Sequence, residues 1–157
     1  MARQSHNPKA WQPLPEITIR YSNKVKMHQR PLANNSRDLW HLFRDNWDFH
    51  TLELYETFKV ILLNSDSRAL GIFTAGTGGL DAVVADRRII FATALKAGAV
   101  AMACCHNHPS GELKPSEEDI ELTEQLIEVA TIHLIDFRDH LIISKYGYYS
   151  MSDEEII

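Results

Sequence analysis

A short stretch in the second half of the chain carries side chains that could bind a metal ion. His106 and His108 are separated by one residue, and Ser116 and Asp119 follow beyond a loop. Two neutral imidazoles and one carboxylate suit Zn²⁺ as ligands, and three protein ligands with one open position are typical of a catalytic zinc site. The pattern therefore indicates one Zn²⁺ per chain, which would lower the pKa of a water molecule to about 7.

The flanking residues indicate how these side chains are positioned. Residues 99–105 form a short, uncharged and apolar run, which predicts a strand buried on both faces. In an extended chain, His106 and His108 point to the same side. Ser116 is then expected to cap a helix that has Asp119 at its third position. The end of a strand would supply two ligands and the first turn of a helix the third.

Each part of this pattern also has a simpler interpretation. Ser116 and Asp119 match a capping box, which stabilises the start of many helices without any metal. A pair of histidines is common on protein surfaces. The conjunction of both histidines, the serine and the aspartate at one strand-to-helix loop favours the metal site. Capping and metal binding are compatible if the Ser116 hydroxyl caps the helix while Asp119 turns outward.

The stretch from His106 to Thr123, HNHPSGELKPSEEDIELT, resembles the signature of RadC-like proteins. These proteins carry a zinc metalloprotease domain of the JAB/MPN type, also called JAMM. The resemblance continues through FKVILLN at residues 58–64 and DHLII at residues 139–143. It implies a RadC-like JAB/MPN domain over residues 34–157. Residues 1–33 are expected to form an N-terminal arm, with a short strand over residues 17–21.

The resemblance also implies roles for individual residues. His106, His108 and Asp119 would hold the zinc ion. The family pattern places a glutamate two residues before Phe58, so Glu56 is the expected general base, with Glu53 as the competing candidate. Ser116 would donate a hydrogen bond to the oxyanion that forms during hydrolysis. The activity implied is hydrolysis of peptide or isopeptide bonds in a peptide or protein substrate.

The rest of the chain predicts an α/β fold, a mixed β-sheet with helices on both faces. Ser36 and Asp86 are expected to cap two helices, and Gly98 to end the second. Leu39, Trp40, Leu42 and Phe43 would form the apolar face of the first helix, continued by Trp47 and Phe49. The expected helices cover residues 37–46, 87–97 and 117–131, and the expected strands cover residues 58–63, 70–75, 80–84, 99–105 and 134–143. This architecture agrees with the JAB/MPN fold, which is similar to that of cytidine deaminases.

Two further sets of residues could belong to the site. Cys104 and Cys105 are neighbours in the expected strand, so they point to opposite faces and do not form a disulfide with each other. Burial explains them more simply than a role near the metal. His140 could be a fourth ligand, although a core histidine with satisfied hydrogen bonds, or one paired with Asp139, explains it better because three ligands complete an open site.

Composition and charge narrow the classes of function. The net charge of −5 disfavours non-specific binding to DNA, which depends on clustered lysine and arginine. No secretory signal or membrane-length apolar run is visible, so a cytoplasmic location is expected. A zinc deaminase requires cysteine ligands in a pattern that is missing here.

Two other functions remain open. The first is a DNA repair-associated RadC-like protein that acts through DNA or protein binding rather than hydrolysis. Residues 1–33 do not resemble the helix-hairpin-helix segment that long RadC proteins carry before the domain. The second is a structural MPN-like module that makes only protein contacts, although such modules usually lack the metal ligands.

Overall fold

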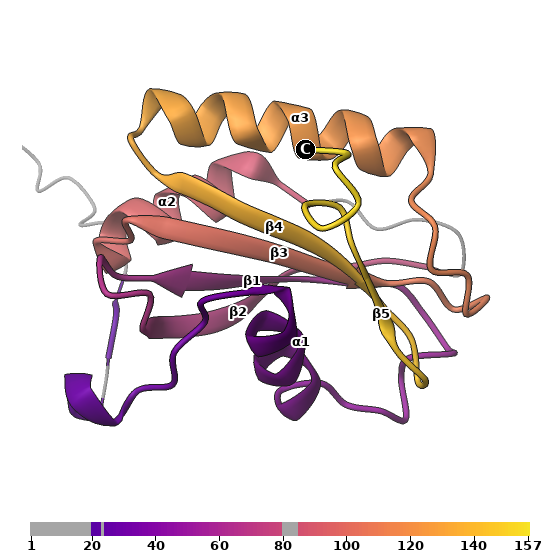
Figure 1. The fold of residues 1–157 in the computed structure, drawn as a ribbon, viewed down its shortest axis with the longest axis horizontal. Coiled ribbons are helices and arrows are strands. Elements are labelled where there is room, and N and C mark those ends of the chain that lie inside the picture. Colours follow the sequence, from indigo (N-terminus) through magenta and orange to yellow (C-terminus); the bar gives the residue numbers. More distant parts are fainter. Residues whose placement is uncertain (1–19, 23, 80–84) are drawn as a thin grey trace, which may run out of the picture.

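The fold is a mixed sheet that holds the end of one central strand against the start of one helix (Figure 1). A computed structural model describes residues 20–22, 24–79 and 85–157. In chain order the elements are η1 (Met27–Gln29), α1 (Ser36–Asp45), β1 (Thr57–Leu63), β2 (Ala69–Thr77), α2 (Arg87–Ala97), β3 (Ala101–Asn107), α3 (Glu117–Ile132), β4 (Asp136–Ile143) and β5 (Tyr148–Ser150).

Within the described residues, five strands form one sheet in the order β2-β1-β3-β4-β5. β1 is antiparallel to both β2 and β3, β3 is parallel to β4, and β4 is antiparallel to β5. The parallel pair requires a crossover, and α3 supplies it between β3 and β4. The predicted class, an α/β fold with a mixed sheet and helices on both faces, is confirmed.

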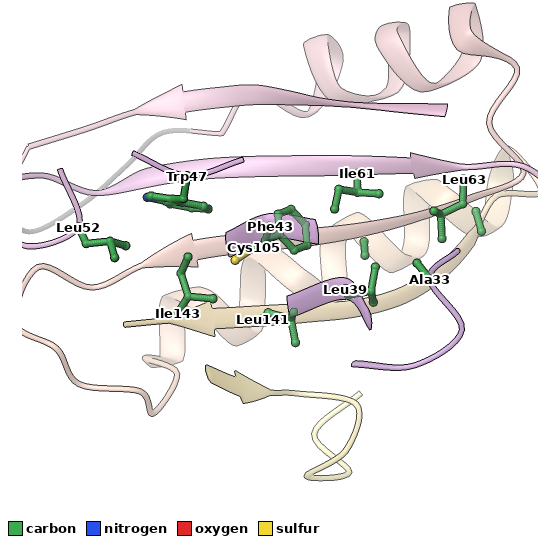
Figure 2. Close-up of a cluster of buried hydrophobic side chains, with 12 residues drawn as sticks. Ala33, Leu39, Phe43, Trp47, Leu52, Ile61, Leu63, Cys105, Leu141 and Ile143 are labelled. Carbon is green, nitrogen blue, oxygen red and sulfur yellow. The ribbon is translucent and has the colours of Figure 1, made fainter. Parts of the chain in front are cut away.

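The central strands carry apolar side chains on both faces, and helices cover both faces of the sheet. α2 and α3 lie over one face and α1 over the other (Figure 1). Figure 2 shows the α1 side, where Phe43 and Leu39 of the helix lie over Ile61, Cys105 and Leu141 of the strands. The opposite face carries a second core cluster, formed by Phe58, Val60, Leu62, Leu70, Ile90, Phe91, Ala94, Met102, Cys104, Leu126, Ala130 and Ile135.

The predicted helix boundaries are close to those observed, with one error in the caps. Asp86 caps α2, and Gly98 ends it in the left-handed conformation at φ +65°, as predicted. The cap of α1 is Asn35, whose side chain accepts a hydrogen bond from the Asp38 N–H. Ser36 is therefore the first helical residue and not the cap. The prediction for Ser36 was wrong because asparagine and serine cap helices equally well.

Some expected core positions also differ from the observed ones. Trp47 is buried beside Phe43, as predicted, whereas Phe49 lies exposed in the turn that follows. On α3 the buried residues are Thr123, Leu126 and Ala130.

Two predictions concern residues that the structure does not describe. The strand expected over residues 80–84 lies outside the described residues, as does most of the one over residues 17–21. Arg20 and Tyr21 are described and are not part of a strand. The domain division at residue 34 stays a prediction. Across the described ranges, no helix combines the length and the apolar character needed to cross a membrane.

Candidate metal centre

His106 and His108 lie together at the end of β3, on the side of the sheet that α3 covers. The chain leaves β3 through the loop at residues 108–116 and returns as α3, which brings Asp119 in the first helical turn over the two imidazoles. His106 Nε2 lies 2.9 Å from His108 Nε2. The Asp119 carboxylate completes the group, with Oδ1 3.2 Å from His106 Nε2 and Oδ2 3.3 Å from His108 Nε2. The three predicted ligands therefore meet.

The separations of these atoms fit a tetrahedral ion. Nitrogen and oxygen ligands bind zinc at about 2.0–2.1 Å, which places neighbouring tetrahedral ligands about 3.3 Å apart. The observed separations are 2.9, 3.2 and 3.3 Å. His106 is only 1 % exposed, while His108 and Asp119 are partly exposed. The group thus has one open side from which an ion and another molecule can approach.

The cluster of His106, His108 and Asp119 is called the metal group below. Asp119 is both a capping residue and a member of this group. Its Oδ2 accepts hydrogen bonds from the Ser116 N–H at 2.8 Å and the Ser116 hydroxyl at 2.7 Å, and Ser116 Oγ accepts from the Asp119 N–H at 3.1 Å. The predicted capping box is therefore complete. The expected outward turn of the Asp119 carboxylate is not observed. Its Oδ2 serves the cap and also faces His108, while its Oδ1 faces His106.

Electrostatics keep the Asp119 carboxylate ionised. Burial on its own would raise the pKa of Asp119, but the close His106 and His108 imidazoles, together with the Ser116 hydroxyl, hold it well below its ordinary value. The same contact with Asp119 raises the pKa of His108. An ionised carboxylate is the form that binds a metal cation.

The second ring nitrogen of His106 and of His108, Nδ1, also has a partner. His108 Nδ1 lies 2.9 Å from the Glu112 carbonyl oxygen. His106 Nδ1 lies 2.8 Å from His140 Nε2, and His140 Nδ1 lies 2.6 Å from Thr123 Oγ1. His140 is therefore a buried histidine with satisfied hydrogen bonds behind the metal group.

The alternative pairing of His140 with Asp139 is not found. Asp139 instead accepts hydrogen bonds from the Ser150 hydroxyl at 2.7 Å and from the Ser152 N–H at 3.1 Å. Neighbouring residues of a strand point to opposite faces, which separates the two side chains. Asp139 thus anchors the turn after β5, while His140 belongs to the site.

Glu56 lies beside the metal group. Phe58 pairs with His106 across β1 and β3, so Glu56, two residues earlier, comes on the same face as the two histidines. Glu56 is 7 % exposed, whereas the competing Glu53 is exposed on the preceding turn. Burial chiefly raises the pKa of Glu56; Asp119 raises it further, while His106 and His108 oppose the rise. A raised pKa brings a carboxylate closer to the range in which it exchanges protons at neutral pH.

Asn107, the residue between the two histidines, fastens the Glu56 segment to β3. Its side chain is fully buried; Oδ1 accepts a hydrogen bond from the Thr57 N–H at 2.8 Å. Its Nδ2 donates to the carbonyls of Leu52 at 2.8 Å and Tyr55 at 3.0 Å. Sequence reasoning missed Asn107 because its partners lie about fifty positions away. Its place inside the His-x-His motif was the available signal.

Other residues considered from the sequence lie away from the metal group. Cys104 and Cys105 are buried on opposite faces of β3, and burial raises the pKa of both thiols. Neither forms a disulfide. Arg88 makes an exposed ion pair with Asp86 at 2.6 Å at the start of α2.

Comparison with known proteins identifies the family. Residues 33–156 match the family described as RadC-like JAB domain. Relatives named UPF0758 protein include those of Flavobacterium johnsoniae (37 % identical over 102 residues), Moorella thermoacetica (33 % over 128 residues) and Porphyromonas gingivalis (33 % over 137 residues). The matches cover 65, 82 and 87 % of this chain but only 44, 55 and 60 % of the respective relatives. The chain thus spans about half the length of these relatives, and over most of its own length it belongs to the RadC-like JAB domain family.

Proposed function

We propose that this domain is a zinc-dependent hydrolase of amide bonds, which acts on a peptide or isopeptide bond of a protein or peptide. The observation that carries the proposal is the convergence of His106 Nε2, His108 Nε2 and the Asp119 carboxylate beside the buried Glu56. Two imidazoles and one carboxylate are the ligand set of several zinc peptidases. Family membership supports the same class of chemistry.

In the proposed mechanism, His106, His108 and Asp119 hold one Zn²⁺. When bound, the metal supplies a Lewis acid that polarises the scissile carbonyl and acidifies the attacking water. Glu56 accepts a proton from that water while the water oxygen forms a bond to the carbonyl carbon of the substrate. Glu56 then delivers the proton to the leaving nitrogen as the C–N bond breaks. Its buried position and raised pKa suit both steps.

Ser116 is proposed to donate a hydrogen bond to the oxyanion. In this structure its hydroxyl donates to Asp119 Oδ2, so the hydroxyl has to rotate toward the substrate for that role. Ser116→Ala separates the two uses. Loss of an oxyanion donor lowers kcat by about 10²–10³-fold with an unchanged metal content. Loss of a cap alone lowers the free energy of unfolding by about 1 kcal/mol and leaves kcat unchanged.

Metal content is the first test. Mass spectrometry of the purified chain, supplied with zinc and freed of excess, should give one zinc per chain. Asp119→Ala should lose it, and Ser116→Ala should retain it, because only Asp119→Ala removes a ligand. A wild-type chain without zinc under these conditions contradicts the proposal. Salt-sensitive DNA binding by such a metal-free chain would instead favour the DNA repair-associated alternative.

Activity is the second test. The zinc-loaded chain is screened against libraries of peptides and of isopeptide-linked conjugates, with Glu56→Gln as the inactive variant and Glu53→Gln as the matched control. Glu56→Gln should keep one zinc and lose turnover, because glutamine fills the same volume but cannot accept the proton. Glu53→Gln should leave turnover unchanged, since Glu53 is exposed on the turn before β1. The reverse outcome would transfer the role of base to Glu53.

A further inference from the structure

We propose that Thr123 and His140 form a hydrogen-bond relay that sets which nitrogen of His106 is free to bind the metal. Neither residue belongs to the ligand set, and both are fully buried behind His106. The relay connects three elements: Thr123 lies on α3, His140 on β4 and His106 on β3. The inference rests on the proposed metal site and adds two positioning residues to it.

The direction of the relay follows from counting protons. Thr123 Oγ1 lies 2.6 Å from the Asp119 carbonyl oxygen, one turn earlier on α3. Two oxygens this close need a proton between them, and a carbonyl has none to give, so the hydroxyl donates its single proton. The contact of 2.6 Å between Thr123 Oγ1 and His140 Nδ1 must then be a hydrogen bond donated by His140.

The same counting extends to His106. Burial favours the neutral form of His140, and a neutral imidazole carries one N–H. Because that proton is on Nδ1, Nε2 of His140 accepts, and the contact of 2.8 Å is donated by His106 Nδ1–H. The lone pair of neutral His106 is therefore on Nε2, the atom that faces His108 and Asp119. A reversed relay would place the proton on Nε2 and block metal binding.

A single hydrogen bond sets the same tautomer in His108. Its Nδ1 lies 2.9 Å from the Glu112 carbonyl, which can only accept, so in the neutral imidazole Nδ1 carries the proton and Nε2 the lone pair. A backbone carbonyl thus serves His108, whereas His106 depends on two side chains. Phe58 closes the relay from solvent, with its ring 5.2 Å from that of His140 and 6.1 Å from that of His106.

Thr123→Val tests the relay because valine keeps the shape of threonine and removes the hydroxyl. His140 Nδ1 then has no acceptor, and the tautomer of His106 is no longer set. Loss of such outer contacts typically weakens metal binding 10–100-fold. We expect a loss of about this size when zinc affinity is measured by chelator competition on the full chain. Thr123→Ser, which keeps the hydroxyl, should return the affinity to within about 3-fold of wild type.

Thr131→Val is a matched control. Thr131 also lies on α3, and its hydroxyl donates to the Ile127 carbonyl in the same way, but it is exposed and far along the helix from the site. Replacing it should not change zinc affinity. A fall in affinity of equal size in both valine variants would mean that the helix is disturbed generally, and would overturn the relay.

A direct readout is the protonation of the imidazole nitrogens in the metal-free protein, measured by long-range ¹H–¹⁵N NMR. His106 should carry a proton on Nδ1 in wild type and in Thr123→Ser, and a form without that proton should become populated in Thr123→Val. A wild-type His106 that lacks a proton on Nδ1 would overturn the relay without any variant. Failure of wild type to bind zinc would instead count against the metal site itself, so the two failures are distinguishable.

Discussion

Replacing Asn107 by alanine should release the segment that carries Glu56. The Asn107 side chain satisfies the Thr57 N–H and the carbonyls of Leu52 and Tyr55, and it is fully buried. A buried polar group left without its partner costs about 1–3 kcal/mol. Relaxation and entry of water into the vacated space reduce the sum of three such losses. We therefore expect the free energy of unfolding to fall by about 3 kcal/mol.

Urea unfolding followed by tryptophan fluorescence measures this loss, because Trp47 is buried in the core next to the segment. With a denaturant slope of about 2 kcal/mol/M, the midpoint should fall by about 1.5 M. Hydrogen exchange at the Thr57 amide should accelerate more than exchange in β4, since the released segment opens locally. Zinc content should stay at the wild-type value because the ligands lie on β3, its following loop and α3.

Two variants make the result interpretable. Asn107→Asp keeps an acceptor for the Thr57 N–H but turns an oxygen toward two carbonyls, so it should destabilise at least as strongly. Asn34→Ala removes an asparagine from an exposed position and should change stability by less than about 0.5 kcal/mol. If Asn107→Ala costs no more than Asn34→Ala, Asn107 does not hold the Glu56 segment and the reasoning is refuted.

Three further predictions test other features of the fold. Gly98→Ala should lower the free energy of unfolding, measured in urea, by about 1 kcal/mol, because an alanine is strained at φ +65°. The added Cβ itself meets no atom within 4 Å, so the backbone conformation is the cause. An unchanged free energy of unfolding would contradict this. Cys104 and Cys105 should resist a thiol reagent at pH 8 until urea unfolds the chain, because burial raises the pKa of both thiols; rapid labelling of the folded protein would show that the strand opens. Hydrogen bonds from Arg88 lower the pKa of Asp86 to about 2. The stability that its ionised form contributes is therefore complete above about pH 4 and is lost as the pH falls through 2. An NMR titration that gives an ordinary pKa would contradict this.

The sequence by itself determined the parts of the molecule that depend on near neighbours. The spacing of His106 and His108 placed both imidazoles on one face, because side chains alternate along a strand. The Ser116 capping box fixed where α3 begins and therefore where Asp119 stands. Local chemistry failed at the start of α1 because it was degenerate there, with Asn35 and Ser36 as adjacent candidate caps.

Only the tertiary structure decided which distant residues support the site. His140 meets His106 because β3 and β4 pair in parallel with Cys104 opposite His140, a register that no local pattern encodes. Asn107 holds residues 52–57 because β1 runs antiparallel to β3 and brings that segment alongside. Hydrogen bonds between such segments form only after the strands have paired. Side-chain spacing therefore predicted which candidate ligands come together, whereas strand pairing and burial decided how these residues and the proposed base are held.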